Sequence, residues 1–156
     1  MTPILRPMRK HDTPECAAIV CASAIGERYG FKPDAFSDTL AAALAAGGEL
    51  FVAEQDVRVI GFAWIDARGA FSTAPYLRLI AVDESLRGSG VGSALLDEFE
   101  RRTVSVGRDW CLLVSDFNTA ARAFYQRHGY REAGALPDFA RVGITEILMV
   151  KKRAQP

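Results

Sequence analysis

The sequence predicts one α/β domain that spans residues 1–156. The length matches about one domain and is large enough to bury a proper hydrophobic core. Apolar runs typical of strands are interspersed with stretches whose apolar residues recur at helical spacing. No internal repeat, linker or low-complexity segment divides these elements. These three observations favour a single folded unit of mixed secondary structure.

The N-terminal third contains one predicted strand and two predicted helices. Residues 3–9 predict a short strand. Asp12 or Thr13 can cap a helix over residues 13–24, which has a proline in its first turn. An alanine-rich helix over residues 34–46 follows, and the glycine pair after it is typical of a helix end.

The middle of the chain predicts strands. Residues 49–55 and 58–67 alternate or run apolar on either side of Asp56-Val57, as the two strands of a hairpin do. Residues 76–83 form a third such run, which leads into a glycine-rich loop. We therefore expect consecutive strands here.

The stretch after the loop predicts an amphipathic helix that begins at Val91 and ends near Gly107. Its apolar face and its charged pairs both have helical spacing. The apolar residues are Val91, Leu95 and Phe99. The i,i+4 pairs are Asp97 with Arg101 and Glu98 with Arg102.

The C-terminal part predicts three strands and one helix. Residues 110–114 read as a buried strand, and residues 118–128 as a helix that stops at Gly129. Two closing strands follow at residues 130–135 and 144–151.

Composition narrows the class of partner. Lys and Arg number 19 and Asp and Glu also number 19, so the formal net charge is zero. No overall field attracts nucleic acid or an anionic membrane, and we expect a small-molecule or protein partner instead. No apolar run is long enough to cross a membrane, and charged residues near the start argue against a signal peptide. The sequence thus predicts a cytoplasmic protein.

The cysteines argue against a disulfide framework and a metal centre. There are three of them, an odd number, and none has Cys-x-x-Cys spacing. This pattern is typical of reduced, mostly buried thiols. The chain has two histidines, and we expect no metal site.

The loop Arg87-Gly-Ser-Gly-Val-Gly92 resembles nucleotide loops but departs from both common types. A dinucleotide fingerprint needs Gly or Ala at its last position, where this chain has Ser93 or Leu95. A phosphate-binding loop of the NTPase kind needs a lysine after its glycines, and this loop has none.

Two interpretations of the loop remain. A helix whose first N–H groups are unpaired, preceded by residues without Cβ, lets a phosphate approach the backbone closely. Arg87 would add a cation beside it. The alternative is a tight turn whose glycines adopt left-handed conformations.

The residues around the loop carry a family resemblance. Residues 79–96, LIAVDESLRGSGVGSALL, closely resemble the coenzyme A-binding segment of the GNAT superfamily of N-acetyltransferases. Arg87, Gly90 and Gly92 fill that family's pattern of Arg or Gln, two residues, Gly, one residue, and Gly or Ala. Residues 118–130, NTAARAFYQRHGY, resemble the family's second motif, in the right order.

The resemblance implies the GNAT fold over nearly the whole chain, with a mostly antiparallel central sheet flanked by about four helices. It also implies acetyl-CoA as cosubstrate, and it assigns parts of the cofactor site. Ile80, Ala81 and Val82 match the strand whose backbone pairs with the pantetheine arm. Arg87, Gly88, Ser89, Gly90, Val91, Gly92 and Ser93 match the pyrophosphate cradle.

Two further residues are assigned by the second motif. Asn118 matches a side chain that contacts the cofactor, and Tyr125 matches the phenol placed by the thioester sulfur. Tyr125 would then be the catalytic acid. The residues themselves leave other roles open, because Asn118 is a good helix N-cap and Tyr125 lies on a stripe that could serve as core packing.

The general base stays unassigned. Some family members carry a glutamate on the strand after the loop helix, where this chain has Leu113. Tyr76 occupies a position from which others use an acid. Asp116, or a water chain that reaches Glu54, are further alternatives.

The resemblance implies an N-acetyltransferase that moves an acetyl group to a primary amine. Residues 26–36 and 139–143 are candidate walls of the acceptor site, although a covering loop or a homodimer contact would also explain residues 26–36. A rival reading is a GNAT-fold domain that binds acetyl-CoA without catalysis, as a sensor or structural subunit. A nucleotide-dependent oxidoreductase is disfavoured because both nucleotide fingerprints fail.

Overall fold

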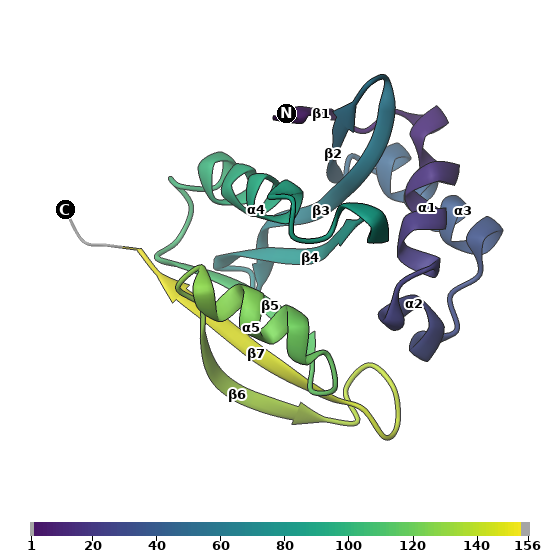
Figure 1. Ribbon diagram of the computed structural model, residues 1–156. Coiled ribbons are helices and arrows are strands. Elements are labelled where there is room, and N and C mark those ends of the chain that lie inside the picture. Colours follow the sequence, from purple (N-terminus) through teal and green to yellow (C-terminus); the bar gives the residue numbers. More distant parts are fainter. Residues whose placement is uncertain (1, 154–156) are drawn as a thin grey trace. The chain divides into compact units, whose positions relative to one another are not determined.

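The computed structural model describes residues 2–153 and contains five α-helices and a seven-stranded sheet there. The strand order is β1-β2-β3-β4-β5-β7-β6 (Figure 1). The strands are β1 Ile4–Pro7, β2 Glu49–Gln55, β3 Arg58–Ala70, β4 Ala74–Val82, β5 Asp109–Ser115, β6 Arg131–Pro137 and β7 Thr145–Lys152. The helices are α1 Thr13–Cys21, α2 Ala24–Tyr29, α3 Pro33–Ala45, α4 Val91–Arg102 and α5 Thr119–Arg127.

The sheet is mixed and mostly antiparallel, which confirms the predicted fold class. β1 with β2, β2 with β3, β5 with β7 and β6 with β7 are antiparallel pairs. β4 and β5 run parallel, with Tyr76 opposite Cys111 and Leu77 opposite Leu112. The chain divides into two compact units, one of residues 2–66 and 79–102 and the other of residues 67–78 and 103–153. One domain over residues 1–156 stays a prediction.

The first unit contains a hydrophobic core between helices and strands. α1 and α3 pack together, and α2 lies next to them (Figure 1). The hairpin of β2 and β3 forms as predicted, and its two turn residues, Asp56 and Val57, both have positive φ, of 51° and 63°. Such left-handed pairs match the twist of adjoining strands. The buried core cluster consists of Met8, Cys16, Val20, Leu40, Leu50, Val52, Val59 and Phe62.

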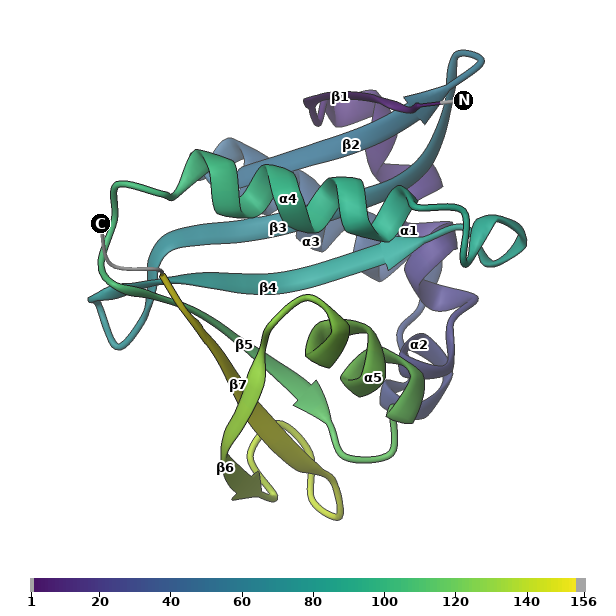
Figure 2. The ribbon, with the colours of Figure 1, turned by 60° about the vertical axis from the view of Figure 1, so that its left-hand side comes forward.

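Helix α4 packs closely against the strands of its own unit (Figure 2). Its predicted apolar face is confirmed, since Val91, Leu95 and Phe99 are buried. Gly61 of β3 makes the close approach possible. A Cβ atom there would lie 2.9 Å from the carbonyl oxygen of Ala81 and 3.2 Å from Leu95 Cδ1. The missing side chain at Gly61 therefore sets how near α4 comes to β3.

Gly61→Ala should lower the free energy of unfolding by about 1–3 kcal/mol, because the added methyl group forces β3 and its neighbours apart. Gly134→Ala on β6 is the matched control, since a Cβ atom there meets nothing within 4 Å and should cost no stability. Urea unfolding of both variants measures the difference. Equal stability of the two would contradict the tight packing at Gly61.

The second unit contains β5, β6, β7 and α5, together with the end of β3 and the first half of β4. Trp110 is buried, and its indole N–H donates a hydrogen bond to Thr103 Oγ1 at 2.9 Å. The Lys151 ammonium lies 5.6 Å from the Trp110 ring centre and 5.8 Å from that of Tyr130, within cation–π range. The rings of Tyr130 and Tyr125 lie 5.9 Å apart, centre to centre, in an edge-on arrangement.

Three local predictions about the helices are wrong. α1 ends at Cys21, and α2 follows it because the Ser23 hydroxyl caps the Gly26 amide at 3.2 Å. α4 ends at Arg102 rather than near Gly107. The Asp12 side chain does not cap α1, because its carboxylate accepts hydrogen bonds from Arg6 and from the Arg9 amide.

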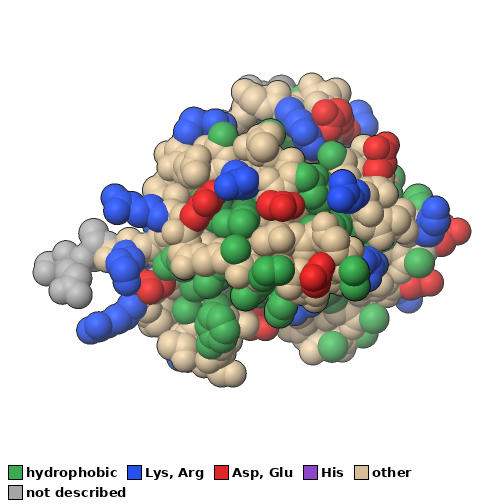
Figure 3. Space-filling model, turned by 90° about the horizontal axis from the view of Figure 1, so that it is seen from below, with side chains coloured by type: hydrophobic (Ala, Val, Ile, Leu, Met, Phe, Trp, Pro, Cys, Tyr) green, Lys and Arg blue, Asp and Glu red, His purple; other side chains and the backbone are tan. Residues whose placement is uncertain are grey.

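The charged pairs on α4 are also different from those expected. Arg102 pairs with Glu98 at 2.8 Å, as predicted, but Arg101 pairs with Glu98 at 2.7 Å and not with Asp97. Both signs of charge are interspersed on the face that Figure 3 shows. This distribution is consistent with the net charge of zero.

The three cysteines are free thiols. Cys16 and Cys111 are buried, and Cys21 is half-buried. Burial raises the pKa of Cys16 to about 12, and it also raises the pKa of Cys21 and Cys111. Within residues 2–153, no group of three His, Cys, Asp or Glu could hold a metal ion. The helices of that range are too short or too polar to cross a membrane.

Candidate active site

The glycine-rich loop connects β4 to α4 inside the first unit. β4 ends at Val82, and a short 3-10 turn at Glu84–Leu86 precedes the loop. Gly88 and Gly90 both have positive φ, of 78° and 92°, which other residues rarely adopt. A Cβ atom at either position would meet nothing within 4 Å. The two glycines are therefore needed for the left-handed backbone conformation and not to avoid a clash, and open space lies beside them.

The loop places the start of α4 next to this open space. The first helical hydrogen bond runs from the Ala94 amide to the Gly90 carbonyl at 3.0 Å. The amides of Val91 and Gly92 precede that bond, at the end of the helix where the dipole attracts anions. The left-handed turn is confirmed. Binding of a phosphate at the start of α4 stays a prediction.

Two polar side chains of the loop, those of Arg87 and Ser89, and the end of β4 before it make up the rest of this region. The Arg87 guanidinium is half-exposed and pairs with Glu84 at 3.0 Å. The Ser89 hydroxyl donates to the Leu86 carbonyl. Residues 80–82 are half-buried at the end of β4. Any anion that approaches Arg87 thus competes with Glu84 for the guanidinium.

Asn118 directly precedes α5 and Tyr125 lies on that helix, both in the second unit. The Asn118 side chain accepts a hydrogen bond from the Ala121 amide at 3.2 Å, so the predicted N-cap is confirmed. Tyr125 is 7% exposed and packs against Phe124 and Tyr130, so its predicted packing role is confirmed too. Their assignments to a cofactor stay predictions.

Burial controls the acidity of the Tyr125 phenol. It raises the pKa of Tyr125 well above the usual value for tyrosine, and the nearby Tyr76 adds to the effect. The phenol is therefore protonated throughout the physiological pH range, as a hydrogen-bond or proton donor must be.

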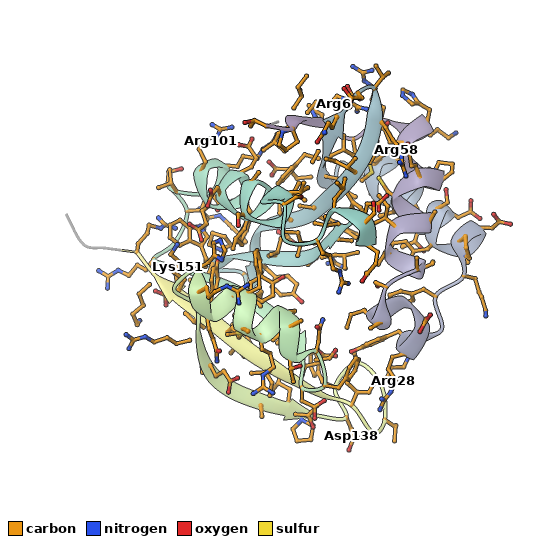
Figure 4. The ribbon with its side chains drawn as sticks, viewed as in Figure 1. Arg6, Arg28, Arg58, Arg101, Asp138 and Lys151 are labelled. Atoms are coloured by element: carbon orange, nitrogen blue, oxygen red, sulfur yellow. The ribbon has the colours of Figure 1, made fainter. Side chains whose placement is uncertain are left out.

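The Glu54 carboxylate, one of the candidates for the base, is bound by Arg6. It accepts hydrogen bonds from the Arg6 guanidinium at 2.9 and 2.6 Å. The same guanidinium binds the buried Asp12 carboxylate, so Arg6 holds two acids together beside β1 and β2 (Figure 4). A carboxylate held in this way is a poor candidate for a general base.

The other candidates for the base differ in their surroundings. Leu113 lies on β5, where it offers no proton acceptor. Burial raises the pKa of Tyr76 and so disfavours the phenolate that a base would need. Asp116 is exposed just after β5, and its amide donates to the Thr145 carbonyl at 2.9 Å.

Sequence reasoning missed a buried carboxylate, Glu146. It is the second residue of β7 and lies opposite Ser115 of β5 in the antiparallel register. Both are nearly inaccessible, at 6% and 4% exposed. A glutamate inside the mostly apolar stretch ITEILMV was the available signal, because charged residues are rarely buried without a role.

Two segments proposed as acceptor walls have different structures. In the first unit, Tyr29, Phe31 and Phe36 form a row of rings with centres 5.7 and 5.0 Å apart. In the second unit, Phe139 and Val142 are exposed in the loop between β6 and β7. Their part in binding an acceptor stays a prediction.

Comparison with known proteins assigns the family. Residues 46–132, more than half of the chain, match the family model for the acetyltransferase (GNAT) domain. The chain belongs to the GNAT acetyltransferase family. The matched GNAT segment includes the glycine-rich loop, Asn118 and Tyr125, whereas residues 26–36 and 139–143 and Glu146 lie outside it.

A curated relative is consistent with the assignment. An uncharacterized N-acetyltransferase of Methanocaldococcus jannaschii is 35% identical over 106 residues, which cover 66% of this chain and 65% of that relative. The match thus spans slightly less than two thirds of the relative's length.

Solved structures show the same fold. A GNAT-family protein from Desulfovibrio desulfuricans matches with a TM-score of 0.80 and 24% identity, over 97% of this chain and 99% of that one. An aminoglycoside 6'-N-acetyltransferase complexed with coenzyme A matches with a TM-score of 0.77 and 17% identity, over 98% and 99%.

Proposed function

We propose that this GNAT protein is an acetyl-CoA-dependent N-acetyltransferase that acetylates a primary amine. The strongest support is the loop from Arg87 to Ser93. Its left-handed glycines, the open space beside them and the start of α4 together suit the pyrophosphate of acetyl-CoA. Residues 80–82 would pair with the pantetheine arm as an added strand does, and Asn118 would contact the cofactor.

The proposed reaction is a direct transfer. The amine nitrogen attacks the thioester carbonyl, the new C–N bond forms, the C–S bond breaks, and the sulfur leaves as a thiolate. Tyr125 would donate its phenolic proton to that sulfur. The amine gives up its own proton to a base or to water, and a proton from that base or from water restores the Tyr125 phenol. The products are then an amide and protonated coenzyme A.

The acidity of Tyr125 shapes this role. A phenol whose pKa lies above its usual value of about 10 is a weaker acid than a thiol, whose pKa is about 8.5. A complete, separate proton transfer to the thiolate would therefore run uphill. Tyr125 acts best as a hydrogen-bond donor to the developing thiolate, with transfer of its proton coupled to the proton lost by the amine.

Thermal unfolding with four ligands tests the donor. Acetyl-CoA and CoA at 100 times their dissociation constants should stabilise the protein by about 2.7 kcal/mol, which corresponds to a rise in Tm of about 5–10 °C for a chain of this size. NADH and ATP, at the same concentrations, serve as controls and should give much smaller shifts. The absence of a shift with either CoA species would overturn the proposed donor.

Turnover separates catalysis from binding alone. Release of CoA from acetyl-CoA, measured against a panel of primary amines, should identify an acceptor and would exclude a non-catalytic sensor or structural subunit. Binding of acetyl-CoA without CoA release for any amine would favour that rival. A cytoplasmic location and a homodimer stay predictions.

A further inference from the structure

Glu146 and Ser115 form a buried polar pair within the second unit. The antiparallel register of β5 and β7 places them directly opposite each other. The Ser115 hydroxyl lies 3.4 Å from one carboxylate oxygen of Glu146 and 3.5 Å from the other. Removing a carboxylate from water is costly unless its charge is used or compensated. Glu146 is therefore a candidate for a functional role as well as for strand packing.

The register also relates this pair to Tyr76. Tyr76 lies opposite Cys111, and Cys111 and Ser115 share one face of β5 because side chains alternate along a strand. Tyr76, Ser115 and Glu146 thus belong to the same face of β4, β5 and β7.

Tyr76 lies between Glu146 and the proposed acid in the electrostatic interactions of the second unit. Burial raises the pKa of Tyr76, Arg78 lowers it, and the Glu146 carboxylate raises it further. Tyr76 in turn raises the pKa of Tyr125. Tyr76 is therefore close enough to feel the charges of both Glu146 and Arg78, and it lies near Tyr125 in turn. A carboxylate and a protonated phenol in one electrostatic environment suit opposite roles in proton transfer.

We propose that Glu146, oriented by Ser115, receives the ammonium group of the acceptor and takes up its proton. This inference rests on the proposed acetyltransferase function and specifies its acceptor as an amine that arrives positively charged. At pH 7.4 only about one amine in a thousand is neutral when its pKa is about 10.4. Glu146 binds the cation, one N–H proton moves to a carboxylate oxygen, and the freed lone pair attacks the thioester carbonyl. As the amide forms and the C–S bond breaks, the nitrogen loses a second proton, which replaces the proton that Tyr125 gives to the departing sulfur. Glu146 later returns the first proton to water.

Glu146→Gln tests the role because it keeps the shape of the side chain and removes its charge. With the amine that gives the fastest wild-type CoA release, kcat/KM for the amine at pH 7.5 should fall at least tenfold, while the dissociation constant of acetyl-CoA should not change. The deficit should shrink as the pH rises toward 9.5, because the solution then supplies neutral amine. Ser115→Ala should cause a smaller loss with the same pH trend.

Glu132→Gln is the matched control. Glu132 is on β6 in the same unit and pairs at the surface with Arg122 at 2.6 Å, so its loss should leave kcat/KM within twofold of wild type. If Glu146→Gln does not fold, Glu146→Asp keeps the charge and withdraws the carboxylate by one methylene group. It should raise the KM for the amine and leave acetyl-CoA binding unchanged.

The outcomes distinguish the two levels of the proposal. Wild-type protein that releases no CoA with any amine overturns the acetyltransferase function and this inference with it. A Glu146→Gln variant with wild-type kcat/KM and an unchanged pH profile overturns this inference alone. A deficit that is constant across pH, or weaker acetyl-CoA binding, assigns Glu146 a purely structural role and also overturns it.

Discussion

Tyr125→Phe should slow turnover by about 10²-fold or more while the affinity for acetyl-CoA stays within about twofold of wild type. The substitution removes one oxygen atom and keeps the ring that packs against Phe124 and Tyr130. The departing thiolate then loses its donor, whereas the glycine-rich loop is untouched. Steady-state kinetics of CoA release, with acetyl-CoA binding measured separately by calorimetry, resolves the two quantities.

Tyr130→Phe is the control for Tyr125→Phe. Tyr130 is a second buried phenol, with its ring centre 5.9 Å from that of Tyr125, so its loss disturbs the same cluster without removing the proposed donor. We expect turnover within a few-fold of wild type. If both variants slow turnover equally, or Tyr125→Phe does not slow it, Tyr125 is a packing residue and the proton donor is elsewhere.

Gly90→Val should abolish the thermal shift with acetyl-CoA at a concentration of 100 times the wild-type dissociation constant, which means a loss of affinity of at least about 10²-fold. The valine side chain would project into the open space beside the loop. A β-branched residue is also strained at a φ of 92°, so the loop itself should shift. The side chain would block the space proposed for the pyrophosphate, and the shift of the loop would displace the backbone amides proposed to bind it.

Gly47→Val separates these effects of Gly90→Val from general strain. Gly47 follows α3, has a φ of 82° and likewise leaves a Cβ atom without contacts within 4 Å. The two variants should therefore lose similar stability, because both force valine into a left-handed conformation. We expect acetyl-CoA to stabilise Gly47→Val as it does wild type. Undiminished stabilisation of Gly90→Val would show that the loop does not hold the pyrophosphate.

Elements with strong periodicity were predictable from the sequence. The apolar alternation on both sides of Asp56-Val57 predicted the hairpin of β2 and β3, and the spacing of Val91, Leu95 and Phe99 predicted the buried face of α4. In each case burial of one face decides the local structure, and the buried apolar residues recur in the sequence at the period of the strand or helix.

Elements decided by single hydrogen bonds were not predictable. α2 is six residues long and has glycines inside it and at its end, so composition alone indicated a loop. Its start depends on the Ser23 cap. By sequence the Asp12 carboxylate could cap α1, but it accepts hydrogen bonds from Arg6 and the Arg9 amide instead. Which hydrogen-bond partner a side chain takes depends on the groups that the fold brings near it, and the local sequence does not contain this information.

The residues of the candidate site also differ in how predictable they were from the sequence. The glycine loop and Tyr125 were found because each belongs to a family motif, and each motif is one continuous segment of the sequence. Glu146 was missed because its neighbours Ser115 and Tyr76 come from other strands. Only the pairing of β4, β5 and β7 reveals that these three residues share a face.

The suppressed acidity of the three cysteines has a practical consequence for measuring turnover. Disulfide reagents react with thiolates, and free coenzyme A has a thiol of ordinary pKa, about 8.5. Cys16, Cys21 and Cys111 hold their protons more firmly, and Cys16 and Cys111 are also buried from the reagent. A colorimetric thiol assay can therefore follow release of CoA in real time, with little background from the folded protein.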